Sequence, residues 1–207
     1  TQSDTALSPR FGLVYEATET ASFYTSFSKG FRPNSGFNFA GVSFEPEFSK
    51  SYEIGAKLSS ADKRLNATVA VYLGEKSNIL TADPINAGFS LSAGEAESRG
   101  FEFDFNGEIA EDLNLNLSYA YTDAQVTKSS LDPNFGLSLP AGSRLINIPR
   151  NQANALLVKG FNWGTAKLTA GVGATYVSDR LGETGVPSFV LPGYTLVNGV
   201  GSWAPNE

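Results

Sequence analysis

Three pairs of acidic residues lie two positions apart along the chain. They are Glu45 and Glu47, Glu95 and Glu97, and Glu102 and Asp104. Two carboxylates at a controlled separation are the machinery of a glycosidase, in which one is the general acid and the other the nucleophile or base. A spacing of two also puts both acids on one face of a strand, as expected of acids that merely line a polar interior. We therefore predict no catalytic residues and no enzyme.

Arginines and phenylalanines in segments rich in Gly, Pro, Asn and Ser form a second set of candidates. Arg suits planar, bidentate contacts with carboxylates, and binding pockets combine apolar walls with a few polar groups. The candidate ligand-binding residues are Arg32, Arg99, Arg144, Phe37, Phe39, Phe44 and Phe135, with Arg150 as a further cation. For each of them, an ion pair with a neighbouring acid or packing within a loop is the alternative role.

Composition excludes several other classes of site. The chain has no Cys and no His, which excludes disulfides, thiolate or zinc sites and a Ser/His triad, so we predict no protein metal site. A net charge of −6 disfavours nucleic acid as a partner. The longest apolar run, near 166–177, is too short and too interrupted for a helical membrane span. Residues 1–9 lack the features of a signal peptide.

The elements that must position these residues are strands. Leu113, Leu115, Leu117, Tyr119 and Tyr121 alternate with polar or small residues, and alternation at a period of two indicates a strand with one apolar face. The same pattern holds at 51–58, 65–73 and 101–106. The pattern also occurs at 166–176 and, less clearly, at 11–16, 22–31, 151–161 and 189–203. The sequence thus predicts about nine strands.

The predicted connections alternate in length. Short links are expected at 17–20, 59–63, 107–112 and 160–164, and long links at 32–48, 76–98, 123–149 and 179–188. Long loops gathered at one end and short turns at the other are typical of a transmembrane barrel. A soluble β-sandwich stays open as the alternative, because its polar face would carry the same residues, such as Glu53 and Lys57. We predict an all-β fold, part of an antiparallel transmembrane β-barrel.

Seven short runs resemble the distal barrel of TonB-dependent siderophore receptors. They are YTSFSKGFRP (24–33), FEPE (44–47), SYEIG (51–55), SRGFE (98–102), LNLSYAYTD (115–123), IPR (148–150) and LPGY (191–194). Their order along nearly the whole chain follows the family. NILTADP (78–84) is most similar to the ferric-hydroxamate and pyoverdine-type branch.

The resemblance implies an outer-membrane receptor that takes up ferric siderophores. The family barrel has about 22 strands and encloses an N-terminal plug, through which the TonB complex supplies energy. Iron would then arrive inside the siderophore, with no separate cofactor, and outer-membrane lipid would surround the barrel. Residues 1–207 are expected to form part of the barrel domain, with the plug and the final strands absent.

Two alternatives within outer-membrane proteins remain open. One is a passive porin, which would lack a plug. The other is a TonB-dependent receptor for a different nutrient, such as cobalamin or a glycan.

Overall fold

A computed structural model describes residues 4–132, 134, 136–164, 166–184, 186 and 189–205. These residues form strands, turns and loops. In that part of the chain, no helix is long and apolar enough to cross a membrane.

Nine long strands form one sheet. They are β1 (Arg10–Thr18), β2 (Ala21–Arg32), β3 (Glu47–Ser59), β4 (Leu65–Ala82), β5 (Ser90–Ala110), β6 (Leu113–Lys128), β9 (Asn151–Trp163), β10 (Ala166–Val177) and β13 (Tyr194–Ala204). The strand order is β1-β2-β3-β4-β5-β6-β9-β10-β13, so neighbours along the chain pair side by side. Two small hairpins, β7 (Ser130–Leu131) with β8 (Ser138–Leu139) and β11 (Arg180–Leu181) with β12 (Val190–Leu191), stand apart from this sheet. The predicted all-β fold and its nine strands are confirmed.

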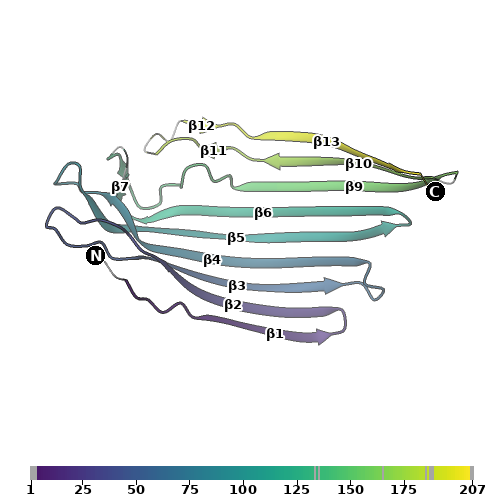
Figure 1. The fold of residues 1–207 in the computed structure, drawn as a ribbon, viewed down its shortest axis with the longest axis horizontal. Coiled ribbons are helices and arrows are strands. Elements are labelled where there is room, and N and C mark those ends of the chain that lie inside the picture. The colour runs from purple at the N-terminus through teal and green to yellow at the C-terminus, as the bar shows by residue number, and fades with distance from the viewer. Residues whose placement is uncertain are drawn as a thin grey trace.

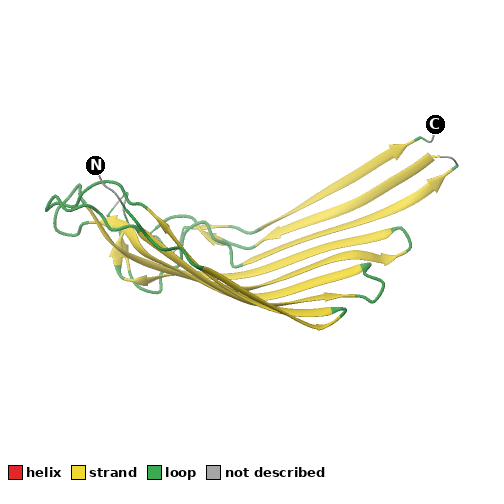
Figure 2. Cartoon of the chain, turned by 60° about the horizontal axis from the view of Figure 1, so that its bottom comes forward, coloured by secondary structure: helices red, strands yellow, loops and turns green. Residues whose placement is uncertain are grey.

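The sheet is a curved, antiparallel trough with different connections at its two ends (Figure 1, Figure 2). Short turns at 19–20, 60–64 and 111–112, and the short link between β9 and β10, lie at one end. Longer connections at 33–46, 83–89, 129–150 and 178–193 gather at the other, which we call the loop end. Lys63 and Asp112 have φ angles of 59° and 54°, the left-handed conformation that tight hairpin turns require.

The predicted link at 76–98 was wrong. β4 continues to Ala82 and β5 begins at Ser90, which leaves only 83–89 as the connection. Two register shifts between β4 and β5 flank Ile79, and Asn78 has a φ of 58°. These irregularities break the alternation of side chains while the ladder of backbone hydrogen bonds continues beyond them.

Other predicted boundaries also moved. β5 extends to Ala110 and β6 to Lys128, so the short link between them is only 111–112 and the following loop begins at 129. The predicted strand 189–203 is two strands, β12 and β13. Pro192 separates them, because proline cannot donate a backbone hydrogen bond to the ladder.

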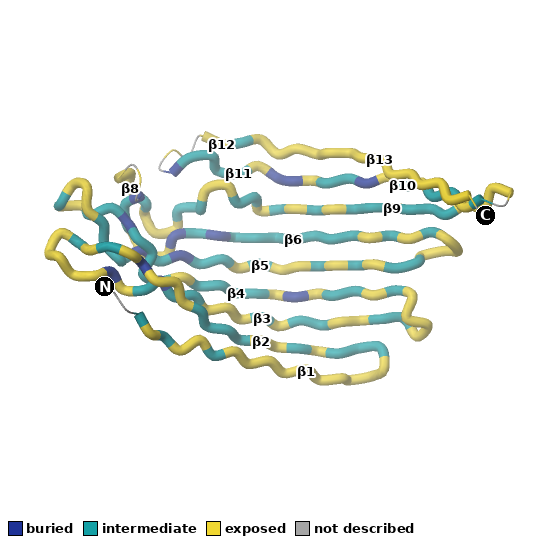
Figure 3. The backbone as a smooth tube through the Cα atoms, viewed as in Figure 1, coloured by how far each residue is buried: buried dark blue, intermediate teal, exposed yellow. Residues whose placement is uncertain are grey.

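Each side of the sheet has its own chemistry. Residues directly opposite each other in paired strands share a face, and the register aligns Phe105, Ala67 and Leu117 on one side. Asp104, Thr68 and Ser118 share the other. We call these the apolar face and the polar face. Buried positions are few and are concentrated toward the loop end (Figure 3), so neither face is covered by a second layer.

Candidate functional site

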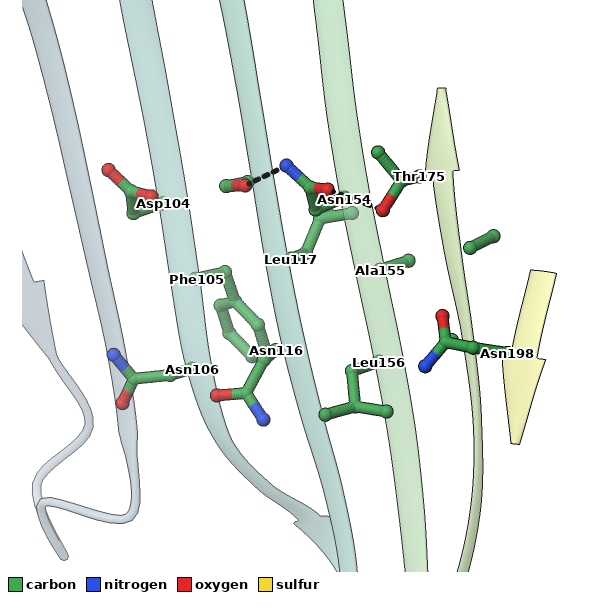
Figure 4. A pocket seen from close by; sticks show the side chains of 13 residues that line it. Asp104, Phe105, Asn106, Asn116, Leu117, Asn154, Ala155, Leu156, Thr175 and Asn198 are labelled. Atoms are coloured by element: carbon green, nitrogen blue, oxygen red, sulfur yellow. Dashed lines mark hydrogen bonds between the residues drawn. The ribbon is translucent and has the colours of Figure 1, made fainter. Parts of the chain in front are cut away.

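The polar face is hollowed across β5, β6, β9, β10 and β13 (Figure 4). A concavity of about 380 Å³ is lined by polar side chains from five strands, among them Asp104, Asn106, Asn116, Asn154 and Asn198. Thr175 Oγ1 donates to Asn154 Oδ1 at 2.8 Å, and Asn154 Nδ2 donates to Ser118 Oγ at 3.3 Å. Amides and hydroxyls both donate and accept hydrogen bonds. Apart from Asp104, this surface therefore offers neutral hydrogen-bonding groups to a hydrated, polar partner.

Three carboxylates stand on the polar face, and one of them, Asp104, lines this hollow. Glu53 is on β3, and Glu102 and Asp104 are on β5 with the predicted spacing of two. None of the three forms an ion pair with a cation in the described ranges of the chain. This acidic row thus offers negative charge to a partner that faces the trough.

Two tyrosines lie flat on the polar face because glycines stand beside them. A Cβ added at Gly55 would be 2.5 Å from Cζ of Tyr24, and one at Gly100 would be 2.9 Å from Oη of Tyr72. Tyr72 Oη and Thr122 Oγ1 are 2.9 Å apart, a hydrogen bond that reaches across β5. Because glycine has no side chain, Gly55 and Gly100 leave room for each ring to cross the neighbouring strand.

Arg32 is held in an ionic cluster at the loop end of the polar face. Its Nη2 donates to Glu47 Oε2 at 2.9 Å, and Lys76 Nζ donates to Glu47 Oε1 at 3.1 Å. The Glu47 side chain is 8% exposed, whereas that of Arg32 is 72% exposed. One buried anion thus supports two cations whose remaining donors face solvent.

A network of amides fixes the adjacent loop. Asn34 Nδ2 donates to the backbone oxygens of Glu45 and Asn78, both at 2.9 Å. Ser92 Oγ lies 3.1 Å from each of the same two oxygens and shares its one hydrogen between them. These contacts tie the loop 33–46 to β4 and β5, so the loop is positioned by the sheet.

The predicted loop phenylalanines have two different environments. Phe44 is buried against Gly36. Phe37 and Phe39 are 60% and 61% exposed, and the ring of Phe39 meets Phe89 edge to face at 5.1 Å between centroids. Phe89 was not predicted, and its contact with Phe39 depends on two loops that are far apart in the sequence. Phe135 lies outside the described residues.

Arg99 lies on the apolar face, since it shares the alternation of Phe101 along β5. Its Nη2 is 3.4 Å from Asp123 Oδ2, and Arg150 Nη2 is 3.7 Å from Asp123 Oδ1. The structure therefore separates Arg99 from Arg32, which stands on the polar face.

Arg144 belongs to the loop 129–150, where it stands opposite Gln125, and its Nη1 is 3.8 Å from Asp179 Oδ2. The neighbouring Arg180 was not singled out by the sequence. Its Nε donates to Asn147 Oδ1 at 2.9 Å, and its guanidinium lies 5.8 Å from the ring centroid of Tyr194. Asn147 and Tyr194 are distant from Arg180 along the chain, so only the fold could reveal these contacts.

Comparisons with known proteins agree with this architecture. The family model described as TonB dependent receptor-like, beta-barrel, matches residues 1–207. The metal-pseudopaline receptor CntO of Pseudomonas aeruginosa is 40% identical over 198 residues, which are 95% of this chain and 27% of that receptor. The chain thus spans about a quarter of the length of this relative.

Two solved structures have the same fold. The siderophore receptor PiuA from Acinetobacter baumannii superposes with a TM-score of 0.78 at 26% identity, covering 94% of this chain and 29% of that one. BauA, the ferric preacinetobactin receptor of the same species, gives a TM-score of 0.82 at 22% identity, covering 97% and 30%. The nine-stranded sheet therefore corresponds to part of a receptor barrel, and the chain belongs to the TonB-dependent receptor-like β-barrel family.

Proposed function

We propose that the protein containing this chain is an outer-membrane receptor that imports a ferric siderophore with energy from the TonB complex. One observation carries the proposal: a continuous antiparallel sheet has an apolar face, a polar face and long loops at one end only. The names of the relatives, a metal-pseudopaline receptor and siderophore receptors, support the ligand class.

In this proposal the apolar face contacts outer-membrane lipid and the polar face lines the lumen. Both outer strands of the sheet, β1 and β13, have one unpaired edge within the described residues. Unpaired backbone groups are costly in a hydrocarbon environment, so further strands of a closed barrel must pair with both edges. The loop end then faces the cell exterior, where a chelate arrives.

The plug is the proposed partner of the lumen wall. Glu53, Glu102 and Asp104 present negative charge to the trough, and the hollow that Asp104 lines also offers amide donors and acceptors. A plug surface with basic and polar groups would complement both regions. The TonB complex would act through that plug and would not contact this chain.

The proposed ligand site is at the loop end. Arg32 and Lys76 supply cationic donors that are fixed by the buried Glu47, while Phe37 and Phe39, with Phe89, supply exposed apolar surface. Phe44 is buried against Gly36 within the same loop. Arg144 and Phe135 stay predictions of ligand contact, and Arg99 is left out because it lies on the opposite face. Iron enters within the ligand, and no separate cofactor is required.

A chelate of another metal is a second candidate, because the relative at 40% identity is by name a metal-pseudopaline receptor. Both ligands are metal chelates, so the same loop end would receive them. A titration of the purified complete receptor with chelates of ferric iron and of other metals separates the two candidates.

Binding of a ferric hydroxamate to the complete receptor, measured by quenching of tryptophan fluorescence, tests the proposal. The double variant Phe37→Ala/Phe39→Ala should weaken binding by roughly tenfold or more, since central aromatic contacts dominate binding energy. Phe189→Ala, an exposed aromatic in the loop 178–193, is the matched control and should change it little. The proposal fails if the receptor binds no metal chelate and instead binds cobalamin or a glycan.

A passive porin gives a different result in cells. Uptake through the complete receptor should stop when the TonB complex is removed. Uptake that continues unchanged would favour the porin.

A further inference from the structure

The charge on the polar face changes abruptly between β5 and β6. On β5 this face carries Glu102, Asp104 and Glu108. The residues directly opposite them on β6 are uncharged, namely Ala120, Ser118 and Asn114. The register continues these rows from β6 over β9 and β10 to β13, and every residue that it places in them is uncharged. We call this part of the polar face, on β6, β9, β10 and β13, the neutral sector.

The neutral sector has short side chains as well as no charge. Gly171 and Gly173 of β10 both belong to it. A Cβ added at Gly171 would be 3.0 Å from a methyl carbon of Val158 and from one of Val200, so only short side chains of the adjacent strands cover the glycine. The hollow of about 380 Å³ crosses this sector (Figure 4). A volume of this size is within the range of sites that bind small molecules.

Part of the hydrogen-bonding capacity of the neutral sector is unused. Asn116 and Asn198 line the hollow, are exposed, and form no side-chain hydrogen bond within the part of the chain that the structure describes. Asn154, which also lines the hollow, is held by Ser118 and Thr175. A free amide offers both donors and an acceptor. A hydrated chelate with hydroxyl, amide or hydroxamate groups can therefore exchange its water for these two amides.

The acidic row has the opposite properties. A chelate that binds to Arg32 and Lys76 at the loop end presents neutral or anionic acceptor groups to these cations, and an anionic chelate is repelled by the carboxylates of the acidic row. Basic groups of the plug would instead form charge-assisted hydrogen bonds with this row, which are roughly twice as strong as neutral ones. When the TonB complex acts on the plug, its contacts with the neutral sector therefore break first.

We propose that the chelate passes this part of the barrel wall over the neutral sector, through the hollow at Asn116 and Asn198, while the plug stays attached to the acidic row. The chelates that fit this passage have neutral or anionic hydrogen-bonding groups. The inference rests on the proposed function and adds to it the side of the lumen that opens. During transport, the neutral sector is thus exposed to solvent, and the acidic row stays covered.

Cysteine labelling during transport tests the inference on the complete receptor in cells, with any other cysteine replaced by serine. Ser118→Cys lies in the neutral sector, and its matched control Ser26→Cys lies on β2 directly opposite Glu53 of the acidic row. The register row of Ser118 reaches β2 at Ser22. Ser26 is therefore nearer to the loop end, and depth alone would favour its labelling.

A membrane-impermeant maleimide should label Ser118→Cys when a ferric hydroxamate and the TonB complex are both present. This labelling should be lost when either is absent. Ser26→Cys should stay unlabelled throughout. Uptake by labelled Ser118→Cys should also be lost, because the maleimide occupies the hollow.

The inference is overturned if Ser26→Cys is labelled as fast as Ser118→Cys, or if Ser118→Cys stays unlabelled while the receptor imports the chelate. Before labelling, Ser118→Cys should bind and import the ferric hydroxamate like the parent, which shows that the variant folds. Asn116→Cys, which has no side-chain hydrogen bond to lose within the described residues, gives the same test if Ser118→Cys folds poorly. A parent receptor that imports no ferric chelate would count against the proposed function, whereas import with the wrong labelling pattern counts against the neutral sector alone.

Discussion

The ring of Tyr24 on β2 lies across Gly55 on β3, where an added Cβ would stand 2.5 Å from the ring carbon Cζ. The side chain of an aromatic residue thus occupies the space that a glycine leaves on the adjacent strand. This contact holds the phenol beside the acidic row of the polar face.

Gly55→Ala should therefore displace the ring of Tyr24 and destabilise the barrel by about 1–3 kcal/mol, the usual cost of overpacking. Urea unfolding of the complete receptor in lipid vesicles measures the change. Gly12→Ala is the control, because nothing lies within 4 Å of a Cβ at that position on β1. Equal stability of the two variants would show that Tyr24 does not depend on the gap at Gly55.

Glu47→Gln should loosen the loop 33–46. The substitution removes the buried charge that Arg32 and Lys76 share, at a cost of about 1–2 kcal/mol, since both cations are largely exposed and partly solvated. Hydrogen exchange of the loop amides measures this loosening. Glu75→Gln, whose contact with Lys50 is exposed and 3.8 Å long, should change exchange much less. Unchanged exchange in Glu47→Gln would mean that the amide network alone fixes the loop.

Acidification should destabilise the connection 83–89 between β4 and β5 and speed its hydrogen exchange. Asn86 Nδ2 and the backbone N–H groups of Ile85 and Asn86 donate to the Asp83 carboxylate, which lowers the pKa of Asp83 below its ordinary value. Because the pKa is lower in the folded state, this stabilisation is complete above about pH 4 and is lost as the pH falls through the folded-state pKa.

The measurement is hydrogen exchange of 83–89 between pH 5 and pH 2, corrected for the intrinsic pH dependence. Asp83→Asn is the control, since it should exchange faster already at neutral pH and show no further transition. A transition that persists in Asp83→Asn would assign the acid effect to another group.

The sequence predicted the strands wherever alternation is regular. Leu113 to Tyr121 alternate without interruption, and β6 covers them. The prediction failed at Asn78 and Ile79, where the register shifts interrupt the side-chain pattern but not the sheet. Local periodicity cannot distinguish an irregular strand from a loop, because the continued backbone pairing depends on residues of another strand.

The sequence predicted which residue types form the candidate site, but it did not predict how these residues are placed relative to one another. Arg32 and Arg99 are both arginines near the loop end, yet strand parity puts Arg32 with Glu47 on the polar face and Arg99 with Asp123 on the apolar face. Parity along one strand was readable from the sequence. Which residues oppose each other required the register, and that is set by the whole sheet.

The central claim is that the apolar face meets lipid while the polar face lines a wet lumen. The chain contains no cysteine, so single cysteines can be placed one at a time on β6 of the complete receptor in its native membrane, with any cysteine elsewhere in the receptor replaced by serine. Labelling with a membrane-impermeant maleimide, after the lumen is opened with urea that leaves the barrel intact, should alternate. Cysteines at Asn114, Asn116 and Ser118 should react, and those at Leu115, Leu117 and Tyr119 should stay protected. Equal labelling of both sets would contradict the account, since it would mean that water reaches both faces of the sheet.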